Sequence, residues 1–144
     1  MTKIFTTLTA LLVSMLAFAQ PSMPTISTGG NEVYYYIQMQ RGQAVITSMG
    51  NGSKVQTATP VANMKKQQTW KVIKKGDNYN IVNAAGQTLY YNTSLNFFCA
   101  GTQPNGVKDL KILKTTNTEY QGFEISTTGS GKTFLNQWGG AGVG

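Results

Sequence analysis

The chain has 144 residues, with 12 lysine and arginine residues against five acidic residues and no histidine. The lack of histidine excludes most acid–base, catalytic-triad and zinc-binding arrangements. A lone cysteine, Cys99, excludes an internal disulfide, so packing must stabilise the fold. Cys99 follows two phenylalanines in a strand-like run, which predicts a small buried apolar side chain rather than a reactive thiol.

Residues 1–19 have the features of a secretory signal peptide. Lys3 gives a basic start, an apolar run covers residues 8–18, and small residues precede an expected cleavage before Gln20. This run is too short to span a bilayer, and no other apolar stretch of the sequence approaches that length. We therefore expect an exported protein, in the periplasm, at the cell surface or outside the cell, with no membrane span.

The charge of the exported chain is positive and scattered. Without Lys3 it has eleven basic against five acidic residues, a net charge of about +6, and its lysines form no long block. A basic balance is compatible with nucleic acid or an acidic polysaccharide. Export removes most nucleic acid from reach, so we expect a solvated basic face and no nucleic-acid partner. No motif indicates a cofactor.

Residues 20–32 contain two prolines and the pair Gly29-Gly30, which predicts a disordered leader. From Val33 onward, short β-type runs alternate with turn residues, and no segment shows a convincing helical period. The expected strands include residues 34–37, 44–46, 79–82 and 89–91. Short strands at a spacing of roughly 8–12 residues indicate an all-β sandwich, barrel or related closed form.

The sequence also repeats internally. The phrases Gly42-Gln43-Ala44-Val45, Gly86-Gln87-Thr88-Leu89 and Gly131-Lys132-Thr133-Phe134 lie 44 and 45 residues apart. The same 44-residue spacing relates Tyr35, Tyr79 and Phe123, and likewise Ile37, Ile81 and Ile125. Residues 70–73 match residues 110–113, 40 positions on. Such a period indicates one supersecondary unit used several times. Three units are too few for a propeller, so a β-trefoil with pseudo-threefold repeats fits best.

Gln68-Thr69-Trp70 forms a Gln-x-Trp signature at the end of the first repeat. With the period and the segments 36–42 and 134–142, it resembles the ricin B-type lectin β-trefoil found in exported bacterial carbohydrate-active proteins. The resemblance covers roughly residues 33–144. It implies a non-catalytic carbohydrate-binding module, N-terminal to the catalytic domain of a larger enzyme. Its partners would be a glycan or polysaccharide and that domain.

Two features depart from the family pattern. Leu110 stands in the second repeat where the first has Trp70, so the signature occurs once. The third repeat would place its counterpart between positions 155 and 159, past Gly144. We therefore expect an incomplete third repeat and a partial sequence.

In ricin-type lectins each site combines an acid after the first strand pair, an aromatic residue and a polar residue near Gln-x-Trp. The equivalent positions here are residues 47–49, 91–93 and 136–138, and none holds an acid. The third repeat gives the best candidate, with Trp138 as a stacking platform and Asn136 and Gln137 as hydrogen-bonding partners. Tyr91 and Asn92 give a second candidate. The alternative for Trp138 is packing against the barrel rim.

Strand alternation places Tyr35 on the inner face with Ile37, and Tyr34 and Tyr36 on the outer face. Trp70 is expected in the core, because its counterpart is an apolar leucine.

Catalysis within these residues is not expected. Three of the five acids, Asp77, Asp109 and Glu119, fall in expected turns rather than in a glycosidase-like pair. Residues 129–133 resemble the end of a phosphate-binding loop but lack its first glycine and continue as a strand, so a β-turn explains them. Two alternatives stay open. One is a structural or protein-interaction trefoil with decayed sugar sites, and the other is an inhibitor of an exported hydrolase acting through residues 102–106.

Overall fold

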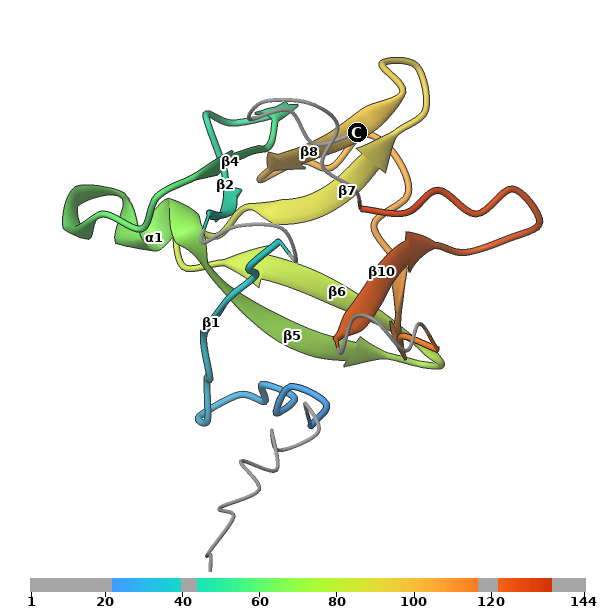
Figure 1. The fold of residues 1–144 in the computed structure, drawn as a ribbon, viewed down its shortest axis with the longest axis horizontal. Coiled ribbons are helices and arrows are strands. Elements are labelled where there is room, and N and C mark those ends of the chain that lie inside the picture. The colour runs from blue at the N-terminus through green and yellow to red at the C-terminus, as the bar shows by residue number, and fades with distance from the viewer. Residues whose placement is uncertain (1–21, 40–43, 117–121, 136–144) are drawn as a thin grey trace, which may run out of the picture.

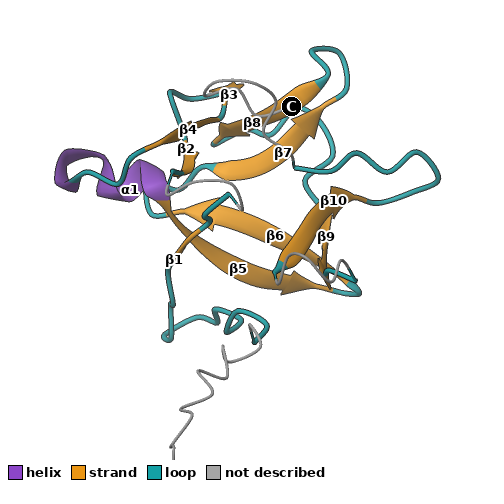
Figure 2. Cartoon of the chain, in the orientation of Figure 1, coloured by secondary structure: helices purple, strands orange, loops and turns teal. Residues whose placement is uncertain are grey.

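The protein is mostly β. The computed structural model describes residues 22–39, 44–116 and 122–135, and within these ranges α1 is the one α-helix (Figure 2). The strands are β1 (Tyr35–Tyr36), β2 (Val45–Thr47), β3 (Ser53–Lys54), β4 (Gln56–Ala58), β5 (Thr69–Lys75), β6 (Asn78–Asn83), β7 (Thr88–Asn92), β8 (Phe97–Gly101), β9 (Leu110–Lys114) and β10 (Phe123–Thr127). A 3-10 turn (Ala62–Met64) leads into α1 (Lys65–Gln68).

The strands pair antiparallel around a central β5–β6 hairpin (Figure 1). On one side β5 pairs with β1. β6 pairs with β9, which in turn pairs with β10. β6 also pairs with β7, and from there the sheet continues through β8 to β3. β2 and β4 form a separate two-stranded sheet. The all-β prediction is therefore confirmed, with strands at each of the expected positions 34–37, 44–46, 79–82 and 89–91.

The internal repeat appears as a repeated strand register. β5 pairs with β6 in the same way that β9 pairs with β10, with partners shifted by 40 residues on one strand and by 44 on the other. The matched pairs are Trp70 with Asn83 and Leu110 with Thr127, then Val72 with Ile81 and Ile112 with Ile125. A second match relates the pair Tyr35–Trp70 to the pair Tyr79–Leu110. The sequence period therefore corresponds to equivalent backbone pairing.

The core lies where these strands face one another. Trp70 and Leu110 are both fully buried, as expected for residues at equivalent positions. The Trp70 indole Nε1–H donates a hydrogen bond of 2.9 Å to the Ile46 carbonyl, which satisfies the one polar group of that ring. Cys99 is fully buried as well, which confirms its assignment as a small core residue. The clustered buried residues are Ile46, Val55, Trp70, Val72, Ile81, Leu89, Tyr91, Phe98, Ala100, Leu110, Ile112 and Leu135.

The glutamine of the Gln-x-Trp signature has a structural role in the first repeat. The Gln68 side chain is fully buried. Its amide Nε2 donates to the Thr59 carbonyl at 2.9 Å and to Thr47 Oγ1 at 3.2 Å, and its Oε1 accepts from the Val61 amide at 2.9 Å. Gln68 and Trp70 thus connect the end of α1 and the start of β5 to β2.

Two local features differ from the sequence predictions. Residues 20–32 were expected to be a disordered leader. In the described part of this stretch, residues 22–32, Ile26 bridges to Val72 of β5, and the Ser27 amide donates to the Val72 carbonyl at 2.7 Å. One apolar and one buried hydroxyl side chain suffice to anchor this stretch despite its loop-like composition. α1 was not predicted, because a single turn is too short to show a helical period.

The phosphate-loop-like segment 129–133 forms no helix. It connects β10 to a bridge between Ser126 and Phe134, and the Thr127 amide donates to the Thr133 carbonyl at 2.9 Å. This agrees with the expected turn between strands. Within the three described ranges, no helix is long and apolar enough to cross a membrane.

Candidate functional site

Two of the sequence-predicted site residues lie in the core. Tyr91 is 8% exposed and packs against Phe98, with ring centroids 5.3 Å apart. Its hydroxyl hydrogen bonds to the Asn96 side-chain oxygen. Little of the Tyr91 ring is therefore open for stacking on a sugar.

Asn92 is equally buried and shapes the β7–β8 turn. Its Oδ1 accepts hydrogen bonds from the amides of Ser94 and Leu95, at 3.1 and 3.0 Å. This is the local side-chain-to-backbone pattern by which asparagine stabilises turns. Because both amides occupy the Asn92 oxygen, the structure gives this side chain a turn-forming role. The other predicted site residues, Asn136, Gln137 and Trp138, lie outside the described residues.

Tyr36 of β1 and Tyr34, directly before β1, are exposed, as strand alternation predicts. Tyr34 is 37% and Tyr36 is 47% exposed, while Tyr35 between them is half-buried. Side chains two residues apart on a strand share a face and stand about 6.6 Å apart. Both phenol rings are therefore partly exposed on the same side of this extended segment.

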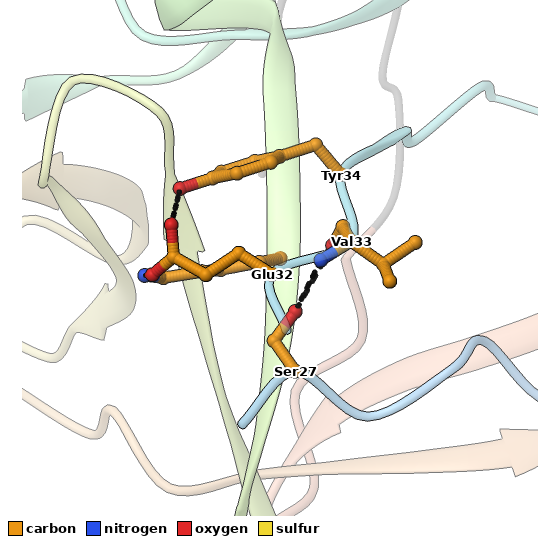
Figure 3. A network of polar contacts seen from close by, with 5 residues as sticks. Ser27, Glu32, Val33 and Tyr34 are labelled. Carbon is orange, nitrogen blue, oxygen red and sulfur yellow. Dashed lines mark hydrogen bonds and ion pairs between the residues drawn. The ribbon is translucent and has the colours of Figure 1, made fainter. Parts of the chain in front are cut away.

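A carboxylate and an ammonium group lie beside Tyr34 (Figure 3). The Tyr34 hydroxyl donates to Glu32 Oε2 at 3.1 Å, and the Lys71 Nζ of β5 forms an ion pair with Glu32 Oε1. Lys71 Nζ also lies 5.8 Å from the centre of the Tyr34 ring, a cation–π distance. We call Glu32, Tyr34, Tyr36 and Lys71 the β1 outer face.

The backbone around Glu32 is fixed by a buried serine. Ser27 is 5% exposed, and its Oγ accepts from the Val33 amide at 2.9 Å and donates to the Val33 carbonyl at 3.1 Å (Figure 3). The segment before β1 is thus held to the N-terminal stretch on β5. These hydrogen bonds fix the backbone at Val33, next to Glu32 and just before β1.

The ion pair shifts both titrating groups in the expected directions. The hydrogen bond from Lys71, followed by the one from Tyr34 and the Lys71 charge, holds the pKa of Glu32 below its ordinary value. The hydrogen bond to Glu32 raises the pKa of Lys71, and burial is the second-largest cause and acts in the opposite direction. Both groups are therefore charged at neutral pH, and the β1 outer face offers an acceptor and a donor to a polar ligand.

Glu32 was not among the site residues predicted from the sequence. It precedes the first repeat's strand instead of following the strand pair. The available signal was its spacing: Glu32, Tyr34 and Tyr36 alternate along an extended segment, which places all three on one side.

An apolar pocket of about 340 Å³ lies between β1 and β10, and Tyr36 of the β1 outer face is one of its lining residues. It is lined mainly by aromatic and aliphatic side chains from β1, β5, β6, β9 and β10. It has no titratable acid, base or thiol among its lining residues except the tyrosine phenols. Its composition suits apolar side chains rather than a reaction.

The buried Cys99 thiol is not arranged for nucleophilic chemistry. Burial raises the pKa of the Cys99 thiol, and burial followed by the neighbouring Cys99 raises the pKa of Tyr90. A protonated, buried thiol is a poor nucleophile. Among the residues that the structure describes, no three acidic or cysteine side chains are grouped as a metal site would require.

Comparisons with protein-family models, with curated proteins and with solved structures give no match. The features of the molecule that bear on its function are the internal repeat and the chemistry of the β1 outer face.

Proposed function

We propose that this protein is an exported, non-catalytic carbohydrate-binding module of the β-trefoil type. The repeated strand register supports the β-trefoil fold in this proposal, because β5–β6 and β9–β10 pair residues at equivalent positions of the repeat. Two equivalent strand pairs, β5–β6 and β9–β10, support a threefold β-trefoil, which would contain a third such pair. The signature Gln68-Thr69-Trp70 and its resemblance to ricin-type lectins support the carbohydrate-binding part.

The β1 outer face supplies the groups that sugar recognition needs. The rings of Tyr34 and Tyr36 can stack on the apolar faces of two neighbouring pyranose units. An ionised carboxylate has about four acceptor positions, so Glu32 can bind sugar hydroxyls while keeping Tyr34 and Lys71. Lys71 adds a charged donor. A polymeric glycan with free hydroxyl pairs, lying along β1, is therefore the proposed ligand.

Such a shallow surface binds weakly by itself. A second site formed by Asn136, Gln137 and Trp138, as the family resemblance implies, would add to it through multivalency. Attached to a catalytic domain, the module would raise the local concentration of that domain at its polysaccharide.

Affinity electrophoresis through gels containing different polysaccharides tests the function. We expect at least one neutral or acidic polysaccharide to retard the wild-type protein, and Tyr36→Ala to remove most of the retardation. Because Tyr36 is 47% exposed, its loss should change the free energy of unfolding by no more than about 0.5 kcal/mol. Leu113→Ala is the matched control, since Leu113 is similarly exposed at 49% on β9.

Two outcomes would contradict the proposal. If no polysaccharide in a broad panel retards the wild-type protein, carbohydrate binding itself is excluded for that panel's chemistries. If retardation survives Tyr36→Ala and Glu32→Gln but is lost in Trp138→Ala, the module binds glycan elsewhere and the β1 outer face is not its site.

A further inference from the structure

Two lysines of β5 lie on the side of the strand opposite to the core. Trp70 and Val72 are buried, at 0% and 5% exposure. Alternation along the strand therefore places Lys71 and Lys75 on its outer side. The two lysines are four residues apart, about 13 Å along an extended strand. Lys71 belongs to the β1 outer face, so Lys75 extends the positive charge from that face toward the β5–β6 turn.

The strand register brings a third lysine to this side. Lys75 pairs with Asn78 of β6, and Tyr79 pairs with Leu110 of β9. One step along these antiparallel strands, Asn78 lies beside Lys111, on the side opposite to the buried Leu110. Neighbouring strands are about 4.8 Å apart, so the Cα atoms of Lys75 and Lys111 are about 10 Å apart across β6. We call Lys71, Lys75 and Lys111 the lysine row.

The charge of the lysine row is only partly neutralised by the protein itself. Glu32 pairs with Lys71, and within the three described ranges this is the one salt bridge. Asp109 lies two residues before Lys111, but its Oδ1 accepts a hydrogen bond of 2.7 Å from Asn80 Nδ2. Lys75 and Lys111 therefore remain available to an external anion.

The end of the β5–β6 hairpin is positive as a whole. Asn80 Nδ2 also donates to the Lys108 carbonyl at 3.0 Å, which places that residue beside β6. The charged side chains described at this end are Lys74, Lys75, Lys108 and Lys111, with Asp77 and Asp109. Four lysines against two acids leave a surplus of positive charge next to the lysine row.

The chemistry of the row favours an anionic ligand with hydroxyl groups. Each lysine ammonium carries three donors, and its hydrogen bonds to an anionic oxygen are stronger than those to a neutral one. Asn78, between Lys75 and Lys111, is half-buried, and its side-chain amide has no hydrogen-bond partner in the part of the chain that the structure describes. A sugar hydroxyl can bind to this amide.

We propose that the glycan bound by this module is an acidic polysaccharide, whose carboxylate or sulfate groups contact Lys75 and Lys111 beside the β1 outer face. The inference rests on the proposed function and narrows its ligand. Carboxylate and sulfate share the anionic oxygens that ammonium groups recognise. Because the row is near the surface, each contact is weak and binding decreases as salt is raised.

Matched polymers test the requirement for negative charge. Polygalacturonate and its fully methyl-esterified form differ in carboxylate charge, and dextran sulfate differs from dextran in its sulfate groups. Isothermal titration calorimetry with the full chain gives the four affinities. We expect at least one charged polymer to bind more tightly than its neutral counterpart, and the polymer pair that shows this identifies the anionic group.

Matched protein variants test the position of the site. Lys75→Gln/Lys111→Gln removes two charges from the row, and Lys65→Gln/Lys66→Gln removes two from α1, at the other end of β5 (Figure 1). We expect the first variant to bind the charged polymer about tenfold more weakly, and the second no more than about twofold more weakly. The exposed single variant Lys75→Gln should lose about threefold. Circular dichroism checks that the variants keep the wild-type fold.

Four results would overturn the proposal. Equal affinity for charged and neutral polymers would retain carbohydrate binding but exclude an acidic ligand. Equal losses in the two double variants would show attraction by overall charge rather than by the lysine row. Single-stranded DNA that binds as tightly as the charged polysaccharide, with the same loss in the row variant, would make the ligand any polyanion. Binding of none of the polymers would instead contradict the proposed function itself.

Discussion

At the scale of single residues, Trp70 and Leu110 show how two different side chains serve one position. Both are fully buried at the start of a strand that pairs with the next repeat. Trp70 also needs an acceptor for its indole N–H and finds it in the Ile46 carbonyl, whereas Leu110 has no polar group to satisfy. The change from tryptophan to leucine therefore leaves the position in the core.

Leu110→Ala is expected to lower the free energy of unfolding by about 2–5 kcal/mol, because it removes buried carbon atoms and leaves a cavity. Leu113→Ala, three residues on along β9, should change it by no more than about 0.5 kcal/mol, because Leu113 is 49% exposed. Chemical denaturation of the two variants measures the difference. Equal effects would show that Leu110 is not a core residue of the second repeat.

The Glu32–Lys71 pair gives a prediction about pH. The pKa of Glu32 is lowered, so its contribution to stability is present above the ordinary carboxyl pKa and is lost as pH falls through the lowered value. The pKa of Lys71 is raised, so its contribution is present below the ordinary lysine pKa and is lost as pH rises through the raised value.

NMR titration of the Glu32 carboxyl carbon measures this directly. In the Lys71→Met variant the Glu32 pKa should rise toward its ordinary value, because the main cause of the shift is removed. In Tyr34→Phe it should rise by a smaller amount. High salt should weaken the shift in the wild-type protein, since the pair is near the surface. An unchanged Glu32 pKa in Lys71→Met would contradict the ion pair.

At the scale of elements, the β7–β8 hairpin and the loop after it depend on close backbone contact. Residues 91 and 107 exchange two backbone hydrogen bonds of 2.9 Å, which brings Gly106 against β7. A Cβ atom at Gly106 would lie 2.1 Å from the Tyr91 carbonyl oxygen. The loop 102–106, considered above as a protruding inhibitory loop, is therefore tied to the sheet at its end.

Gly106→Ala is expected to destabilise the protein by about 1–3 kcal/mol, because the backbone must move to admit the methyl group. Gly131→Ala is the control, since a Cβ there would meet nothing within 4 Å. Thermal unfolding of both variants, followed by circular dichroism, gives the comparison. A Gly106→Ala protein as stable as Gly131→Ala would mean that the loop does not approach β7 as described.

At the scale of the whole molecule, the sequence predicts the repeated core well and the surface poorly. The 44-residue spacing of Ile37, Ile81 and Ile125 reflects a register that backbone pairing imposes, so it is visible in the residues themselves. Burial of Trp70 and of Cys99 follows from the same apolar pattern. These features depend on alternation and period, which a single sequence contains.

The site residues were harder to predict because turn and surface positions have no such period. Asn92 has a side chain of the kind that binds polar ligands, but its Oδ1 accepts hydrogen bonds from two backbone amides of its own turn. Glu32 lies in a stretch whose composition suggested disorder, and Lys71 reaches it from 39 residues away. The contact between them depends on how residues 22–32 lie along β5, which no local pattern in the sequence indicates.

Chemical-shift mapping tests the central claim, that the β1 outer face binds a glycan, most directly. The ¹⁵N-labelled protein is titrated with an oligosaccharide of whichever polysaccharide retards it most. We predict that the amide shifts cluster at residues 32–36 and at Lys71, and that Tyr91 and Asn92 are unaffected. Shifts confined to the Trp138 indole and its neighbours, or to residues 91–92, would contradict the claim.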